Sequence, residues 1–348
     1  MSTSWGKRHW CGQPAALRAS RMTQALSPIG RGHGHAKLIL VGEHWVLDGA
    51  VAVAIALPSL HTTAQFTDHA CGCAAVTYHW PATLAGPATA LAMQMANLAC
   101  EQAGIAPAAI AVESTIPIQR RMGSSAALAV ALVRAAADFS QQTLDDATLL
   151  QRARTLEDCV HGQSSGLDPA AASAAGGAVL FANGQIVERL PTVAPSLSTA
   201  FWVLADTGAG QPAKVAIDHA RLRRQALPAD DYRYWFAAVA VAAEGTAQAL
   251  RSGDVALLAH HLRAAAATLQ PLAIVNESMQ LAMQVLSKAG AVAVKPTGAG
   301  LGGVIVGLAA DATAAAAMTA AAAAAGFGVS QFRVASPASF SVGVYASV

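Results

Sequence analysis

Charged and aromatic residues are scarce in this chain. Asp, Glu, Lys and Arg together make up 12% of the 348 residues, aromatic residues make up 5%, and the formal net charge is +2. A nucleic-acid-binding protein would show lysine and arginine gathered in a basic stripe, and no such stripe is present. We therefore expect no nucleic-acid partner.

Long apolar runs and a cysteine framework are also lacking. The alanine-rich stretch 309–326 comes nearest to a membrane helix, but it carries Asp311 and threonines, so we expect no membrane span. The five cysteines are odd in number and irregularly spaced, which argues against a disulfide framework. Cys71 and Cys73 have no second pair to complete a metal site. These features favour a reduced, cytoplasmic protein.

The length of the chain favours two domains. We place a disordered extension at 1–33, an N-terminal domain at 34–194 and a C-terminal domain at 195–348, with the boundary in the Pro/Ser-rich stretch 191–198. The second half shows a strand, several helices and then a β-β-α-β-β pattern, which indicates a split ferredoxin-like unit with extra helices. In the first half, strands are expected at 37–42, 50–57 and 60–66, helices at 124–139 and 145–160, and a hairpin around Asn183-Gly184.

Two glycine-bearing segments have a composition that suits phosphate. In 117–127, a strand leads into Gly123-Ser124-Ser125 and a helix follows, and the start of a helix favours an anion. A serine N-cap on a buried alanine helix explains the same residues. In 295–303, four of the six residues from Gly298 to Gly303 are glycine, which suits close approach to a ligand or, alternatively, a glycine-rich connection between strands.

Two carboxylates and a lysine complete the set of candidates. Glu157 and Asp168 lie eleven residues apart, which would allow one to bind a metal and the other to act beside a nucleophile. A solvated glutamate and a helix-capping aspartate are the alternative. Lys37 begins an apolar strand and would project from its end into a site, or else lie at the surface of a strand edge. Glu43 and His44 occupy the turn that follows.

Together and in this order, these segments resemble the GHMP kinases, the superfamily of galacto-, homoserine, mevalonate and phosphomevalonate kinases. Residues 37–49 resemble the opening Gly-Glu-His-x-Val motif, and 117–127 resemble the phosphate loop ending Gly-Ser-Ser-Ala-Ala. Residues 161–168 and 297–303 resemble the His-Gly-x-x-Ser-Gly-x-Asp and Thr-Gly-Ala-Gly-x-Gly-Gly motifs. The resemblance spans about residues 34–345, and its opening motif is most similar to that of mevalonate kinases.

This resemblance implies an α+β, two-domain GHMP kinase fold. The N-terminal domain would be ribosomal protein S5 domain 2-like and would bind ATP and substrate, and the C-terminal domain would be ferredoxin-like. The implied reaction is ATP-dependent phosphorylation of the primary hydroxyl of mevalonate, with Mg²⁺, to give 5-phosphomevalonate. A homodimer is expected on the same basis.

The resemblance also assigns roles to individual residues. Asp168 would act on the substrate hydroxyl as general base or electrostatic orienter, and Lys37 would stabilise charge beside it. Glu157 and Ser125 would hold Mg²⁺. Contacts with ATP are implied for Gly123, Ser124, Ser125, Ala126, Gly298, Gly300 and Gly302, and contacts with mevalonate for Glu43, His44 and Thr297.

Four residues depart from the family pattern. Gln119 and Arg121 stand where the phosphate loop normally has glycines, Ala213 stands where a threonine lies near the site, and Ser164 replaces the usual proline. These departures keep two alternatives open. One is a GHMP kinase for another small alcohol, such as a sugar or a phosphomevalonate, and the other is a nucleotide-binding pseudokinase.

Overall fold

The structure is a computed structural model. It describes residues 29–67, 76–79, 87–106, 108–116, 122–162, 164–191, 193–208 and 210–334. Cys71, Cys73, Gln119 and Arg121 lie outside the described residues, as does the extension up to residue 28. Residues 29–33 were assigned to that extension from the sequence, but they form the start of a strand.

The first domain is built on a sheet whose central strand is β2 (Ala52–Thr67). Along one edge β2 pairs antiparallel with β1 (Ile29–Val41), and along the other it pairs with β4 (Ala109–Ser114) and β5 (Ala178–Ala182). Strand β3 (Val76–His79) extends the sheet beyond β4, and β6 (Gln185–Leu190) extends it beyond β5. The two strands expected at 50–57 and 60–66 are therefore one long strand, whose register with β1 shifts at His35/Ala36.

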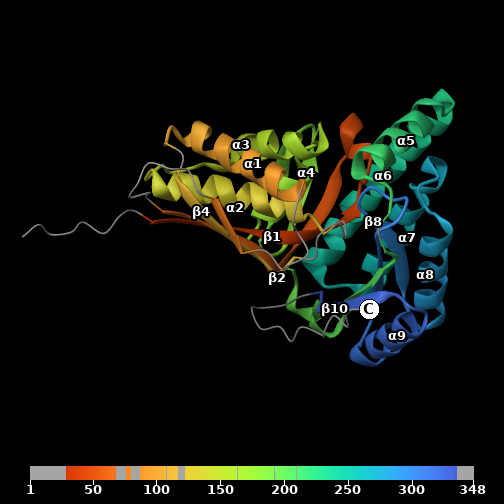
Figure 1. The fold of residues 1–348 in the computed structure, drawn as a ribbon. Coiled ribbons are helices and arrows are strands. Elements are labelled where there is room, and N and C mark those ends of the chain that lie inside the picture. Colours follow the sequence, from red (N-terminus) through yellow and green to blue (C-terminus); the bar gives the residue numbers. More distant parts are fainter. Residues whose placement is uncertain are drawn as a thin grey trace, which may run out of the picture.

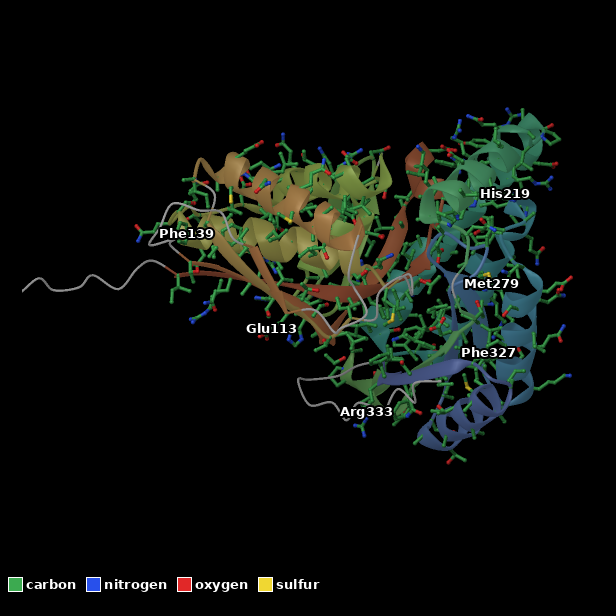
Figure 2. All side chains as sticks on the ribbon, in the orientation of Figure 1. Glu113, Phe139, His219, Met279, Phe327 and Arg333 are labelled. Carbon is green, nitrogen blue, oxygen red and sulfur yellow. The ribbon has the colours of Figure 1, made fainter. Side chains whose placement is uncertain are left out.

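Helices of the first domain cover one face of this sheet. They are α1 (Pro87–Ala103), α2 (Ser124–Phe139), α3 (Asp146–His161) and α4 (Leu167–Ser173), and they lie together above the strands (Figure 1). The bounds of α2 agree with the helix expected from the sequence. Phe139 lies at the end of α2 that is farther from the second domain (Figure 2), so the helix begins near the junction of the two domains.

Helix α2 lies directly on β1 because the contact is made of small residues. A Cβ atom added at Gly30, Gly32 or Gly34 would come within 2.2 Å of a carbonyl oxygen of α2. Those carbonyls belong to Ala135, Ala131 and Ala127 respectively. Two strand residues advance about 6.7 Å and four helix residues about 6 Å, so the two spacings match. The alternate glycines thus allow the first residues of β1, from Ile29 onward, to pack against α2.

The second domain has an antiparallel sheet in the order β10-β7-β9-β8. Its strands are β7 (Phe201–Asp206), β8 (Ala293–Thr297), β9 (Val304–Ala309) and β10 (Gly328–Arg333). Helices α8 (Glu277–Lys288) and α9 (Ala312–Ala324) pack on this sheet, which gives the ferredoxin-like unit that the sequence predicted. The helices α5 (Ala213–Gln225), α6 (Ala229–Ser252) and α7 (Val255–Ala267) are the additional ones.

One hydrophobic core crosses the junction between the domains. The side chains of β1 alternate, so that Leu38 and Leu40 join a core that also contains residues of α6, α7 and β9, whereas Ile39 packs with α4. Three short 3-10 helices, η1 (Trp45–Asp48), η2 (Pro195–Thr199) and η3 (Gln270–Leu272), connect the larger elements. The boundary that we propose between 194 and 195 lies between β6 and β7.

Within the part of the chain that the structure describes, no helix has both the length and the apolar character needed to cross a membrane.

We predict that the shared core makes the two domains unfold together. Leu40→Ala removes a fully buried side chain from that core and should lower the free energy of unfolding by about 2–5 kcal/mol. Calorimetry and urea denaturation should show one transition that moves as a whole. Leu222→Ala, at an exposed position of α5, is the control and should change stability by less than about 0.5 kcal/mol. Two separate transitions, of which only one moves, would contradict the prediction.

Candidate active site

An ion pair between Lys37 and Asp168 lies at the centre of the candidate site. The alternation of β1 points Lys37 toward α2 and α4, on the same side as Ile39. Its Nζ atom lies 2.9 Å from Oδ1 of Asp168, the second residue of α4. The lysine side chain is 2% exposed and the aspartate 32%, so the ammonium is buried while the carboxylate is open to solvent.

Gly123 allows the start of α2 to approach Lys37. Its φ of 78° lies in the left-handed region, and an added Cβ atom would lie 2.8 Å from Cγ of Lys37. The backbone N–H of Lys37 also donates to the carbonyl of Met122 at 3.0 Å. Gly123 is the N-cap and offers no side chain to cap the helix. The first-turn N–H groups of Ser124, Ser125 and Ala126 therefore form an arrangement that suits an anion.

Glu157 is a second, fully buried carboxylate beside this pair. Ser125 Oγ donates to its Oε1 at 2.9 Å, and Ser164 Oγ donates to its Oε2 at 3.1 Å. Burial raises the pKa of Glu157 to about 7, and the nearby charge of Asp168 acts in the same direction. The lysine of the central pair opposes that shift. The structure therefore brings together Lys37, Asp168, Glu157 and Ser125, which the sequence had singled out separately.

The oxygens around Glu157 are compatible with Mg²⁺. A glutamate carboxylate and a serine hydroxyl are hard donors, and Mg²⁺ is commonly held by one or two carboxylates together with substrate phosphates. Among the described residues, no group of three or more His, Cys, Asp or Glu could hold a metal on its own. Glu157 and Ser125 thus suit an ion that arrives with a nucleotide.

The glycine loop after β8 needs its glycines for conformation. Gly298, Gly300 and Gly302 all have positive φ, at 82°, 76° and 111°. At Gly300 an added Cβ atom would lie 2.6 Å from Cβ of Ile274, and the N–H of the next residue donates to the Ile274 carbonyl at 2.7 Å. A simple hairpin connection would not require so many left-handed residues. The loop is held in one shape by the second domain.

The residues expected to contact mevalonate lie where the two domains meet. Glu43 is buried and forms an ion pair with Lys295 of β8, whose Nζ also donates to the carbonyl of Ile39 at 3.1 Å. Burial raises the pKa of Glu43 and lowers that of Lys295, while the attraction between them opposes both shifts. Thr297 Oγ1 accepts from the N–H of Ile39 and donates to its carbonyl, both at 3.1 Å.

The turn after β1 makes two further contacts with the second domain. His44, with a φ of 63°, donates from Nε2 to the carbonyl of Ala299 in the glycine loop at 3.1 Å. Asp48 accepts from the buried guanidinium of Arg224 and from the hydroxyl of Tyr232 at 3.0 Å. The segment from Glu43 to Asp48 therefore joins the domains in addition to bordering the candidate site.

Lys295 and Arg224 were not predicted from the sequence as site residues. Lys295 carried a usable signal, because it lies in a short apolar strand directly before a glycine loop, just as Lys37 begins an apolar strand. Arg224 gave no such signal in the sequence. It follows Arg221 and Arg223 on the same helix, and those two arginines are exposed, so nothing local marks Arg224 as buried. Ala213, the position where a threonine was expected, is the first residue of α5.

Family models match both domains of the chain. The model described as GHMP kinases N terminal domain matches residues 90–177, and the model described as GHMP kinases C terminal matches residues 246–327. A curated mevalonate kinase of Aeropyrum pernix is 28% identical over 283 residues, which cover 78% of this chain and 86% of that protein.

Solved structures of this family share the fold. L. major mevalonate kinase in complex with R-mevalonate superimposes with a TM-score of 0.73 at 22% identity, over 86% of this chain and 92% of that one. Streptococcus pneumoniae phosphomevalonate kinase in complex with phosphomevalonate and AMPPNP superimposes with a TM-score of 0.70 at 16% identity, over 87% and 99%. These two relatives bind different acceptors, so likeness of fold does not choose between them.

We predict that Glu157 makes the metal-free protein less stable as the pH rises. Its pKa is about 7 in the folded protein against an ordinary value of 4.5 for glutamate. The stability that protonated Glu157 contributes is therefore fully present below about pH 4.5 and is lost as the pH rises through 7. In EDTA, the free energy of unfolding of the wild type should fall by about 2–3 kcal/mol more than that of Glu157→Gln between pH 5 and pH 8. Urea denaturation at both pH values measures this difference. Parallel pH dependence in the two proteins would exclude a titrating Glu157.

Proposed function

The chain belongs to the GHMP kinase family, and from this premise we propose that it transfers the γ-phosphoryl group of ATP to the primary hydroxyl of mevalonate. The product is 5-phosphomevalonate. The observation that carries the proposal is the ion pair of Lys37 and Asp168 beside Glu157 and Ser125. The choice of mevalonate is supported by the 28% identical mevalonate kinase, which aligns with 78% of this chain.

Asp168 is the residue that acts on the acceptor hydroxyl. Its carboxylate is one-third exposed, so an alcohol can reach it, and it can accept the proton of the hydroxyl or orient that hydroxyl for attack. Lys37 lies 2.9 Å from it with a buried ammonium, which stabilises negative charge where the phosphoryl group is transferred. Phosphoryl transfer is catalysed mainly by such positioning and electrostatics.

The nucleotide is held at the start of α2. The N–H groups of Ser124, Ser125 and Ala126, in the first turn of α2, would donate to the phosphates, and Gly123 would let the backbone come close to them. Glu157 and Ser125 would hold Mg²⁺, which would neutralise charge on the β- and γ-phosphates. Gly298, Gly300 and Gly302, whose positive φ angles shape the loop after β8, would lie beside the phosphates.

The acceptor end is shaped by the contacts between the domains. Glu43 and Thr297 fix the end of β1 against β8, and His44 ties the following turn to the glycine loop. We assign Glu43 and His44 to the mevalonate end because they lie in the turn after β1, the strand that carries Lys37. Thr297 joins them because it contacts Ile39 of that strand. Their fixed contacts favour a preorganised site.

A kinase for a different small alcohol is the second candidate. It is favoured by Ala213, which lacks the hydroxyl of the threonine expected near the site. A pseudokinase that binds nucleotide without turnover is a third candidate. Activity assays with a panel of acceptors distinguish these two candidates from a mevalonate kinase.

We predict that activity depends on the central ion pair. Asp168→Asn and Lys37→Met should each lower kcat for mevalonate-dependent ADP release by a factor of about 10²–10⁴, because the first removes the base and the second the compensating charge. Asp146→Asn is the control, since it removes a carboxylate from an exposed ion pair with Arg189 on the same domain. A variant of Lys37 or Asp168 that keeps more than about a tenth of wild-type kcat would contradict the assigned roles.

We also predict the preferred acceptor. With ATP and Mg²⁺, kcat/KM for mevalonate should exceed that for phosphomevalonate, galactose or homoserine by at least about 100-fold, because polar groups of the site left unpaired by a wrong acceptor are costly. A coupled ADP assay over this panel measures the ratio. Activity on another alcohol but not on mevalonate would favour the second candidate, and nucleotide binding without turnover of any acceptor would favour the third.

A further inference from the structure

Ser164 links the two carboxylates of the proposed site. It lies between α3, which carries Glu157, and α4, which carries Asp168, and it is 7% exposed. Its Oγ atom donates to Glu157 Oε2 at 3.1 Å and accepts from the N–H of Gly166 at 3.2 Å. Its own N–H donates to Asp158 Oδ1 at 2.6 Å. The serine therefore makes three polar contacts within one turn.

The hydroxyl of Ser164 has a defined direction. A serine hydroxyl has one hydrogen to donate, and because the oxygen accepts from Gly166, the hydrogen is used on Glu157. This contact orients the carboxylate so that its other oxygen, Oε1, lies 2.9 Å from Ser125 Oγ. The same hydroxyl holds the residue that caps α4, and Asp168 is the second residue of that helix.

The residue usual at this position in the family could make neither contact. Proline has no hydroxyl and no backbone N–H, so it could not donate to Glu157 or to Asp158. In this chain, Ser164 donates two hydrogen bonds at the position where the family pattern has a proline ring.

We propose that Ser164 is a positioning residue for the Mg²⁺ ligand Glu157, holding Oε2 so that Oε1 and Ser125 present a matched pair of oxygens to the ion. This inference rests on the proposed function for the identity of the ion and of the nucleotide. It adds a residue that acts on the metal through Glu157 and ties the metal ligand to the turn before Asp168.

The test measures binding of Mn²⁺, a probe for Mg²⁺, to the protein with AMPPNP, by electron paramagnetic resonance of free Mn²⁺. Ser164→Ala should weaken Mn²⁺ binding by about 10- to 100-fold, which is the usual effect of removing a partner of a metal ligand. Ser164→Thr keeps the hydroxyl and should restore affinity to within about threefold of wild type. Ser164→Cys, which keeps a side chain of similar size with a weak donor, should resemble Ser164→Ala.

Thr155→Ala is the matched control. It removes a hydroxyl from the same helix as Glu157, but that hydroxyl is exposed and donates to the backbone carbonyl of Gln151. Its Mn²⁺ affinity should equal that of the wild type. Circular dichroism in EDTA checks that each variant is folded, and the cysteine variant carries the test if the alanine variant is not.

Three outcomes would overturn the inference. They are unchanged Mn²⁺ affinity in both the alanine and cysteine variants, failure of Ser164→Thr to restore affinity, and no Mn²⁺ binding by the wild type with AMPPNP. The readout is independent of the acceptor. Weakened Mn²⁺ binding in a protein that does not phosphorylate mevalonate supports the inference and rejects the proposed substrate. Phosphorylation of mevalonate by a protein whose Mn²⁺ binding does not change in the Ser164 variants supports the proposed substrate and rejects the inference.

Discussion

The close contact between α2 and β1 is the constraint on which the site depends. Glycine at three alternate residues of β1, Gly30, Gly32 and Gly34, lets the helix carbonyls lie where side chains would otherwise stand. At the start of the helix, Gly123 also lacks a side chain. There the same lack of a side chain makes room for Lys37. The position of the lysine, the direction of the helix N-terminus and the location of Ser125 are thus consequences of one packing arrangement, since a rigid helix places its first turn once its axis is fixed.

Two buried lysines serve different purposes in this fold. The ammonium of Lys295 and the carboxylate of Glu43 are both removed from water, so the pair joins the turn after β1 to β8 at a considerable desolvation cost. Lys37 is equally buried, but its partner Asp168 is one-third exposed. An exposed partner can exchange a contact with water for a contact with substrate. The difference in exposure of the two carboxylates, rather than the presence of an ion pair, distinguishes the candidate catalytic pair from the structural one.

The two domains act as one unit around this site. Leu38 and Leu40 contribute to a core shared with α6, α7 and β9, while the other face of the same strand bears Lys37. The turn after β1 is then fixed by contacts of His44 with the glycine loop and of Asp48 with Arg224. Such a junction leaves few independent ways for the acceptor end to change shape, which is consistent with catalysis by positioning.

Elements with local signals could be predicted from the amino-acid sequence. The alanine-rich stretch after Gly123 gave the bounds of α2. Asn183-Gly184, with φ of 51° and 77°, marked the hairpin of β5 and β6 because these residues tolerate left-handed conformations. The ordered motifs also indicated Lys37, Glu157 and Asp168 as candidates. Tertiary structure alone decided that β2 is one strand, that β1 begins at Ile29, and that Glu43 pairs with Lys295, 252 residues away. Those outcomes depend on which surfaces pack together, and a contact between distant segments leaves no periodic or turn signal in either of them.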